Sequence, residues 1–153
     1  GTLTNAGLGG KGVQAQFGAQ LTLDGVAVSA SSEFGVAFLW AGGSVKHSLI
    51  FDTLRAGDNT FGDALMVTGA VVDIEGSYAR ASERAGILFD KSEGVVRGCL
   101  LTENKIGLAV QGEPGPTIGT DNVIEGNDED TPSGQDLAVP NEALDLPGQS
   151  GPR

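Results

Sequence analysis

A repeat of about 22 residues constrains this chain more than any other feature of its sequence. Five similar segments, each a small residue followed by alternating apolar positions, begin at Gly12, Gly35, Ala64, Gly86 and Gly107. Successive openings are therefore 23, 29, 22 and 21 residues apart. A second set of apolar segments begins at residues 21, 44, 71, 94 and 117, so its intervals of 23, 27, 23 and 23 residues follow nearly the same period. Two segments that share one period predict a stack of structural repeats.

The regular unit is best seen in residues 86–104, GILFDKSEGVVRGCLLTEN, where short apolar strands alternate with turns. Such a unit cannot bury its own apolar face and needs neighbours above and below it, which is typical of one rung of a parallel β-helix. Alternation within the strands predicts four inward rows. These rows are Val36, Leu65, Ile87 and Leu108; Phe38, Val67, Phe89 and Val110; Leu23, Val45, Ile74 and Val96; and Val28, Ile50, Ala79, Leu101 and Ile124.

Two further columns of the repeat predict how the rungs turn. Glycine dominates a bend between the third and fourth rows, which suits a backbone with positive φ. This column reads Gly25, His47, Gly76 and Gly98. Small polar residues occupy a corner three positions after the fourth row, where we expect a ladder of side-chain hydrogen bonds. This column reads Ser31, Thr53, Ser82, Asn104 and Asn127.

Composition agrees with an all-β chain of one domain: 25 of the 153 residues are glycine and only 5% are aromatic. The formal net charge of −11 disfavours nucleic acid as a partner, because phosphate binding needs a basic stripe. No run of residues is apolar and long enough to predict a membrane span. We expect a Gly-rich cap or partial rung in residues 1–11, the β-helix in 12–128 and an acidic tail or linker in 129–153. The tail is either free or docked on the stack.

Two segments give the chain a resemblance to a known family. The rung that ends LLTEN, residues 100–104, and the segment TIGTDNVIEGN, residues 117–127, resemble repeats of bacterial right-handed parallel β-helix proteins of the pectin-lyase-like superfamily. The resemblance covers residues 12–128 and implies a right-handed solenoid. The five repeats predict about five rungs, and the acidic, proline-containing composition of the following residues predicts an irregular C-terminal tail. The resemblance also implies an extracellular or cell-surface location, although the fold hosts lyases, hydrolases, epimerases, adhesins and scaffolds alike.

A row of alternating charge precedes the bend on successive rungs: Asp24, Lys46, Glu75 and Arg97. Polysaccharide lyases of the superfamily use acids and bases on an outer face, so the resemblance permits a catalytic interpretation. Catalysis would need clustered acids for calcium and an unpaired base. An alternating row instead pairs each charge with its neighbours, which favours a structural charge ladder.

The one departure from the period is a longer second rung, whose surplus falls in residues 53–63, TLRAGDNTFGD. Insertions in solenoids project as loops and often bind ligands. The candidate binding residues are Asp52, Arg55, Asp58, Asn59 and Asp63. Their oxygens suit calcium, but the spacing matches no calcium loop, so no metal or other cofactor is expected.

The outward positions of the first strands predict a flat, partly apolar face. Its members are Ala37, Leu39, Trp40, Met66 and Leu88. Exposed faces of this kind are usually covered or bind partners. Either the C-terminal tail covers this face, or identical copies of the chain associate through it.

The residues support two functional hypotheses. The first is a non-enzymatic extracellular or cell-surface module that serves as a scaffold or binds a polysaccharide or a protein weakly. The alternative, which the resemblance allows, is a fragment of a polysaccharide lyase, a glycoside hydrolase or a uronate epimerase. A cluster of acids beside an unpaired Arg or Lys would favour the enzyme, whereas the repeat supplies a charge ladder. His47 is the only histidine, so a zinc site built on several imidazoles is excluded and any histidine-dependent triad would have to include it.

Overall fold

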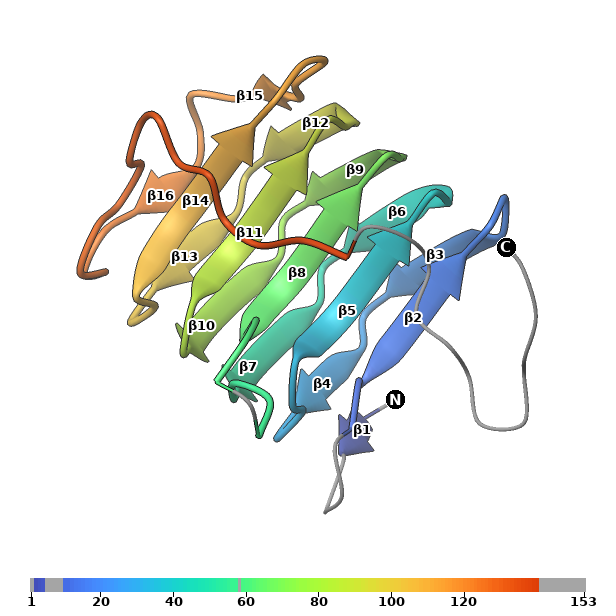
Figure 1. The fold of residues 1–153 in the computed structure, drawn as a ribbon, viewed down its shortest axis with the longest axis horizontal. Helices are drawn as coiled ribbons and strands as arrows, with labels where there is room; N and C mark the ends of the chain where they lie inside the picture. Colours follow the sequence, from blue (N-terminus) through green and yellow to red (C-terminus); the bar gives the residue numbers. More distant parts are fainter. Residues whose placement is uncertain (1, 5–9, 58, 141–153) are drawn as a thin grey trace.

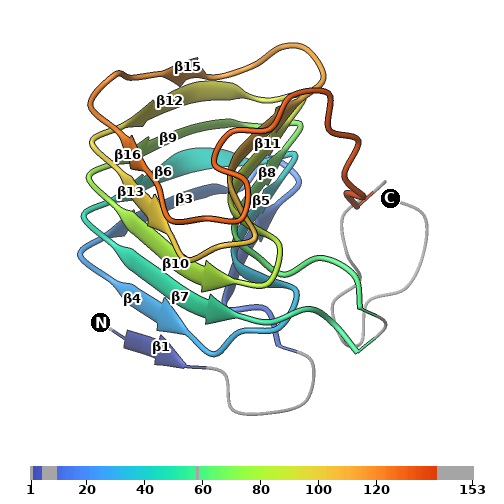
Figure 2. The same ribbon diagram turned by 90° about the vertical axis from the view of Figure 1, so that its left-hand side faces the viewer.

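A computed structural model of the chain describes residues 2–4, 10–57 and 59–140. These residues form sixteen strands and no helix, and every strand pairing is parallel (Figure 1). The expected all-β parallel β-helix is confirmed: the chain is a β-solenoid of about five rungs. Each regular rung supplies one strand to each of three sheets, so the sheets enclose a common interior (Figure 2).

The three sheets have the following members. The first strands of the rungs make sheet B: β2 (Val13–Gln16), β5 (Phe34–Leu39), β8 (Asp63–Thr68), β11 (Ala85–Asp90) and β14 (Ile106–Gln111). The second strands make sheet C: β3 (Gln20–Asp24), β6 (Gly42–Lys46), β9 (Val71–Glu75), β12 (Glu93–Arg97) and β15 (Thr117–Ile118). The third strands make sheet A: β1 (Thr2–Thr4), β4 (Ala27–Ser29), β7 (Leu49–Thr53), β10 (Tyr78–Ser82), β13 (Leu100–Thr102) and β16 (Val123–Ile124).

The strand registers confirm the four predicted inward rows. Leu65 pairs with both Val36 and Ile87, and Ile50 pairs with both Val28 and Ala79. Members of all four rows join one core cluster, because strand alternation points every second side chain into the solenoid. Val110 is the exception: it holds the predicted register but is 38% exposed, because its strand lies at the last full rung.

Three columns of left-handed backbone turn the rungs, and one of them, near the end of the third strands, has φ between 54° and 72° at Ala30, Asp52, Ala81, Glu103 and Gly126. The predicted bend is confirmed, with φ between 48° and 66° at Gly25, His47, Gly76 and Gly98. Another column, which the repeat alignment did not reveal, follows the first strand of each rung and has φ between 47° and 70°. Its members are Phe17, Trp40, Gly69, Lys91 and Gly112. Non-glycine residues rarely adopt this conformation, so the hydrogen-bonded stack must stabilise it.

Asparagine side chains cross-link the last rungs at the predicted polar corner. The Asn104 Oδ1 accepts a hydrogen bond from the Ser82 amide at 3.0 Å, and its Nδ2 donates to the Ala79 carbonyl at 3.1 Å. Asn127 repeats both contacts one rung higher, with the Asn104 amide and the Leu101 carbonyl. The Asn104 Nδ2 also donates to the Asn127 Oδ1 at 3.1 Å, so the two side chains bond to each other as well as to the main chain of the rung below. On the lower rungs the expected ladder is wrong, because the buried hydroxyls of Ser31, Thr53 and Ser82 have no hydrogen-bond partner among the described residues.

Candidate functional site

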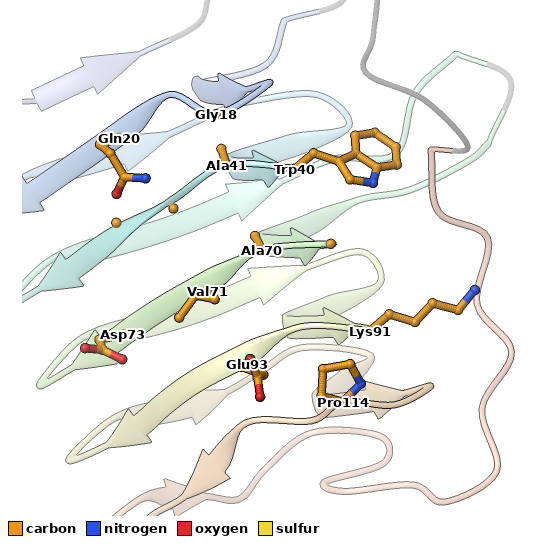
Figure 3. A pocket seen from close by; sticks show the side chains of 13 residues that line it. Gly18, Gln20, Trp40, Ala41, Ala70, Val71, Asp73, Lys91, Glu93 and Pro114 are labelled. Carbon is orange, nitrogen blue, oxygen red and sulfur yellow. The ribbon is translucent and has the colours of Figure 1, made fainter.

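A groove of about 620 Å³ lies on the outside of the solenoid, where sheet B turns into sheet C (Figure 3). Small residues form its floor: Gly18, Ala41, Gly42, Gly43, Gly69 and Ala70. Larger side chains line the rest of it: Gln20, Trp40, Val71, Asp73, Lys91, Glu93 and Pro114. Because small residues occur at this turn on neighbouring rungs, the groove follows the stacking direction instead of crossing a single rung.

The position of the Trp40 ring is fixed by the residues on either side of it. Its indole lies over Gly69, where an added Cβ would come within 2.5 Å of the Trp40 Cδ1. On the other side the ring stacks on Phe17, with centroids 6.3 Å apart and an angle of 16° between the planes. The missing side chain at Gly69 is therefore what allows a large, half-buried aromatic ring to lie against the turn.

Polar groups project beside this aromatic surface from neighbouring strands. Gln20 lies over Gly42, whose absent side chain leaves room for the Gln20 amide. Asp73 accepts a hydrogen bond from the Val95 amide at 3.1 Å, which holds its carboxylate at the groove. Glu93 enters from the rung above (Figure 3). The groove thus combines an aromatic face with amide and carboxylate groups that can bind hydroxyls.

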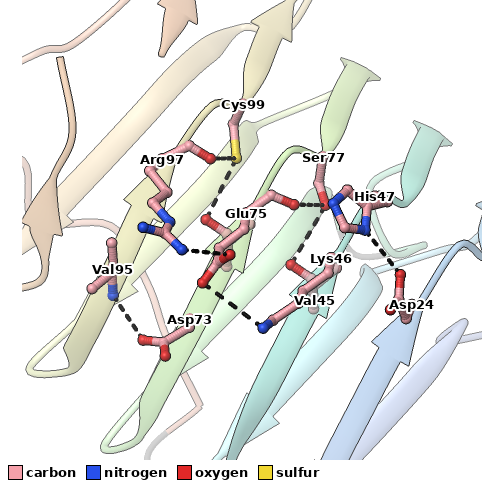
Figure 4. A network of polar contacts seen from close by, with 11 residues as sticks. Asp24, Val45, Lys46, His47, Asp73, Glu75, Ser77, Val95, Arg97 and Cys99 are labelled. Atoms are coloured by element: carbon pink, nitrogen blue, oxygen red, sulfur yellow. Dashed lines mark hydrogen bonds and ion pairs between the residues drawn. The ribbon is translucent and has the colours of Figure 1, made fainter. Parts of the chain in front are cut away.

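The charge row lies on sheet C as the sequence predicts, with Lys46 and Arg97 paired in register on either side of Glu75 (Figure 4). An Arg97 Nη2 lies 2.9 Å from Glu75 Oε2, and the Lys46 Nζ lies 3.9 Å from Oε1. The hydrogen bond from Arg97 lowers the pKa of the Glu75 carboxyl, and the same contact raises the pKa of Arg97. Asp24 instead lies 3.0 Å from the Nδ1 of His47. These charges are paired along the stack.

Of the candidate binding residues that the structure describes, the insertion loop brings only Arg55 and Asn59 together. Asp52 and Asn59 are exposed, Arg55 is half-buried and donates to the Asn59 carbonyl, and Asp58 lies outside the described residues. Arg55 and Asn59 line two hollows of about 440 and 630 Å³ beneath the loop, and Lys105 lines both as well. Neither Asp52 nor Asp63 lines these hollows.

Asp63 is not an exposed ligand, so this part of the predicted loop site is wrong. It is fully buried and receives two hydrogen bonds from Arg84, at 2.6 and 2.8 Å, and one from the Ala85 amide at 3.1 Å. Burial raises the pKa of the Asp63 carboxyl, and the Arg84 guanidinium opposes that effect. The physical reason is register: Asp63 pairs with Phe34 and opens strand β8, so it belongs to sheet B and not to the loop.

The predicted partner face must also be corrected, because the chain covers it itself. Ala37, Leu39, Met66 and Leu88 have no exposed surface, and only Trp40 is partly exposed. We call the buried set on this side of sheet B the outer apolar face. It consists of Phe34, Ala37, Leu39, Met66, Ala85, Leu88, Ile106 and Ala109.

Three segments cover the outer apolar face. Phe61 of the insertion loop packs against Phe34, with ring centroids 5.0 Å apart. Trp40 packs on the face from the groove side, and Leu137 and Val139 pack on it from the C-terminal segment. Of the two sequence-based alternatives for the tail, docking is therefore what the described residues show.

Several contact residues were not identified from the sequence. Gln111 and Arg84 hold the C-terminal segment, while Gln20, Asp73 and Glu93 line the groove. Outward polar residues on strands usually face solvent, so no local signal distinguished them. Arg84 is the exception, because it directly precedes strand β11, whose first residue is buried. An arginine at such a position was a sign that an acidic partner, here Asp63, lies close to it.

The described residues contain no group of three or more His, Cys, Asp or Glu side chains that could hold a metal ion. Within the same part of the chain, no helix is long and apolar enough to cross a membrane. Burial raises the pKa of the Cys99 thiol, which bonds to main-chain carbonyls inside the stack.

Fold and site together define a parallel β-solenoid with a lateral groove and a self-covered apolar face. Comparison of the chain with protein-family models, curated protein sequences and solved structures gives no match. The resemblance to the pectin-lyase-like superfamily therefore rests on residues 100–104 and 117–127 alone.

Proposed function

We propose that the chain is a non-enzymatic binding module at the cell surface or outside the cell, and that its groove binds a neutral polysaccharide weakly. The observation that carries this proposal is the half-buried Trp40 ring held over Gly69 beside several polar groups. The solenoid acts as the rigid support, since each groove residue projects from a strand or from the turn between two strands.

The chemistry of the groove suits a sugar ring. The C–H groups on one face of a pyranose pack against aromatic surface, here the part of the stacked Phe17 and Trp40 rings that stays exposed, and the hydroxyls at its edge need hydrogen-bonding partners. Gln20, Asp73 and Glu93, which line the same groove as Trp40, supply such partners. The volume of about 620 Å³ falls in the range of small-ligand sites.

Charge favours a neutral ligand over a uronate polymer. The chain carries a net charge of −11, and two carboxylates line the groove against one lysine. A polyanion would therefore be repelled at long range by the net charge of the chain and at the groove by the two carboxylates. The groove is open and shallow, so we expect dissociation constants of about 0.1–1 mM, typical of a module that gains avidity from repetition.

The experiment uses the fluorescence of Trp40, the only tryptophan of the chain. Hexaoses of β-linked glucose, xylose and N-acetylglucosamine are titrated, and a saturable blue shift of the emission is expected with at least one of them. Binding of W40A is measured by affinity electrophoresis in gels that contain the matching polysaccharide, where retardation should vanish. The control is F51A, which removes a half-buried ring from sheet A and should leave retardation unchanged.

The absence of any saturable shift with all three hexaoses, together with equal mobility of W40A and the unaltered chain, would refute the proposal. Incubation with uronate polymers and calcium tests the enzyme alternative. Detection of unsaturated products that absorb in the ultraviolet would identify the chain as a lyase and would contradict the proposal of a binding module.

A further inference from the structure

The C-terminal segment occupies the outer apolar face in the manner of a bound peptide. Residues 131–140 form no strand, and this segment crosses the outer side of sheet B (Figure 1). Leu137 and Val139 are half-buried against the face, whereas Ala138 between them is exposed. This alternation is that of an extended peptide with every second side chain directed into an apolar groove.

Polar side chains of the solenoid hold the main chain of this segment. Gln111 donates to the Leu137 carbonyl at 2.9 Å and accepts from the Leu137 amide at 2.9 Å. Arg84, which is 6% exposed, donates to the Ala138 carbonyl at 2.8 Å. Asp63 binds the remainder of the Arg84 guanidinium and fixes its direction. The face therefore recognises a backbone in extended conformation together with a Leu-x-Val pattern.

The solenoid does not depend on this segment for its strand pairing. The strands of sheet B pair with each other, and β14 also bridges to Glu129 at Ile106, but none of them pairs with residues 131–140. The connection that leads to the docked residues is largely solvent-exposed, at Thr131, Ser133, Gly134 and Asp136. Gly134 has a φ of 69° and nothing within 4 Å of a Cβ placed on it, so the backbone there can change direction without a clash.

We propose that the outer apolar face accepts the same segment from a second copy of the chain, so that two copies exchange their C-terminal segments reciprocally. The second copy carries the Leu-x-Val pattern by definition, and every contact to Gln111 and Arg84 is reproduced in the exchanged pair. At low protein concentration each chain binds its own segment in preference to that of another copy, because the covalent connection gives its own segment a high effective concentration. Exchange therefore becomes dominant at high protein concentration, or when the connection is too short for docking on the same copy.

The test shortens the connection in the full chain by deletion of residues 131–135. The Leu108 amide donates to the Asp130 carbonyl, and Leu137 docks at Gln111, three positions further along β14. The positions of Leu108 and Gln111 are about 10 Å apart along the strand. After the deletion, two peptide steps span at most about 7.6 Å, so the segment cannot reach its own face.

We expect the deletion variant to form a dimer of twice 15.5 kDa by light scattering at about 10 μM protein, and the unaltered chain to be monomeric there. Addition of L137D to the deletion should return it to the monomer. A138D is the matched control, because it places the same charge on an exposed position of the same segment, and its dimer should persist. A deletion variant that stays monomeric with native circular dichroism would overturn the proposal.

A second measurement keeps the proposal testable if the deletion variant does not fold. Hydrogen exchange is followed on the unaltered chain, where the Leu137 amide bonds only to the Gln111 side chain. If the segment leaves independently, this amide exchanges at least tenfold faster than the amides of β11. Equal rates would mean that the segment leaves only when the whole solenoid unfolds, and exchange between copies would then be excluded.

Discussion

Replacement of Asn104 by alanine tests whether the asparagine ladder holds the rungs together. Asn104 is 2% exposed, and its side chain is the partner of two main-chain groups on the rung below, the Ser82 amide and the Ala79 carbonyl. Alanine leaves both groups buried without a hydrogen bond. Each such group costs about 1–3 kcal/mol, so N104A should lower the free energy of unfolding by about 2–6 kcal/mol.

This loss corresponds to a fall in melting temperature of roughly 4–24 °C for a chain of this size. Urea unfolding is followed by circular dichroism and by the fluorescence of Trp40, so that local and global transitions are distinguished. N127A should cost less, about 1 kcal/mol, because Asn127 is half-buried and water can replace part of its contacts.

The matched control is E103A, one residue away at the same corner. The Glu103 side chain is 60% exposed, and its ion pair with Arg80 is long at 3.8 Å. Its removal should change the free energy of unfolding by no more than about 0.5 kcal/mol. If N104A also lies within that range, the corner does not need its ladder and the reasoning about buried main-chain groups is refuted.

Three further predictions concern the groove, the charge row and the buried ion pair. G69A places a Cβ 2.5 Å from the Trp40 ring at a φ of 58°, so it should displace the indole, shift the emission to longer wavelength and cost about 1–2 kcal/mol of stability. R97A removes the hydrogen bond that lowers the pKa of Glu75, so carbon-detected NMR titration should show that pKa rise towards its ordinary value. R84M leaves a buried carboxylate without its cation and should cost about 3–5 kcal/mol in urea unfolding.

Each of these predictions has a control. G134A has a similar φ of 69° but no neighbour within 4 Å, so its fluorescence should not change. K46A should raise the pKa of Glu75 less than R97A does, because its contact is longer at 3.9 Å. The double variant D63L/R84M should recover most of the stability lost in R84M, and no recovery would contradict the cost assigned to the unpaired carboxylate.

The sign of the Glu75 effect also predicts a dependence on pH. A carboxyl whose pKa is lowered in the folded chain contributes stability above its unfolded pKa, and this contribution is lost as the pH falls through the folded value. The unaltered chain should therefore lose more stability than R97A on acidification below about pH 4.

The rungs were predictable because each is specified by its own residues and repeated by its neighbours. Leu65, Ile87 and Leu108 recur at one spacing, and alternation assigns them to the interior without any knowledge of the rest of the chain. The glycine column at Gly76 and Gly98 likewise predicted positive φ from a local rule. Local rules summed over repeats were sufficient for the fold.

The site was less predictable because its contacts join segments with no common period. Leu137 meets Gln111 across 26 positions, and Arg84 meets Ala138 across 54. The apolar LAV of the tail was visible in the sequence, but the polar side chains that hold its backbone were not. The turn at Trp40 was missed because its column contains Phe17 and Lys91 as well as glycines, so composition gave no sign of positive φ.

The asparagine corner has a consequence for how a chain of this kind grows. Asn104 and Asn127 make the same pair of contacts to the rung below, and Gly86 and Gly107 leave the same space for their side chains. At this corner the joint between the fourth and fifth rungs thus repeats the joint between the third and fourth. Tandem duplication of one rung of about 22 residues would therefore reproduce the same asparagine contacts at the new joint. A solenoid of this kind can lengthen by whole rungs without new substitutions at this corner.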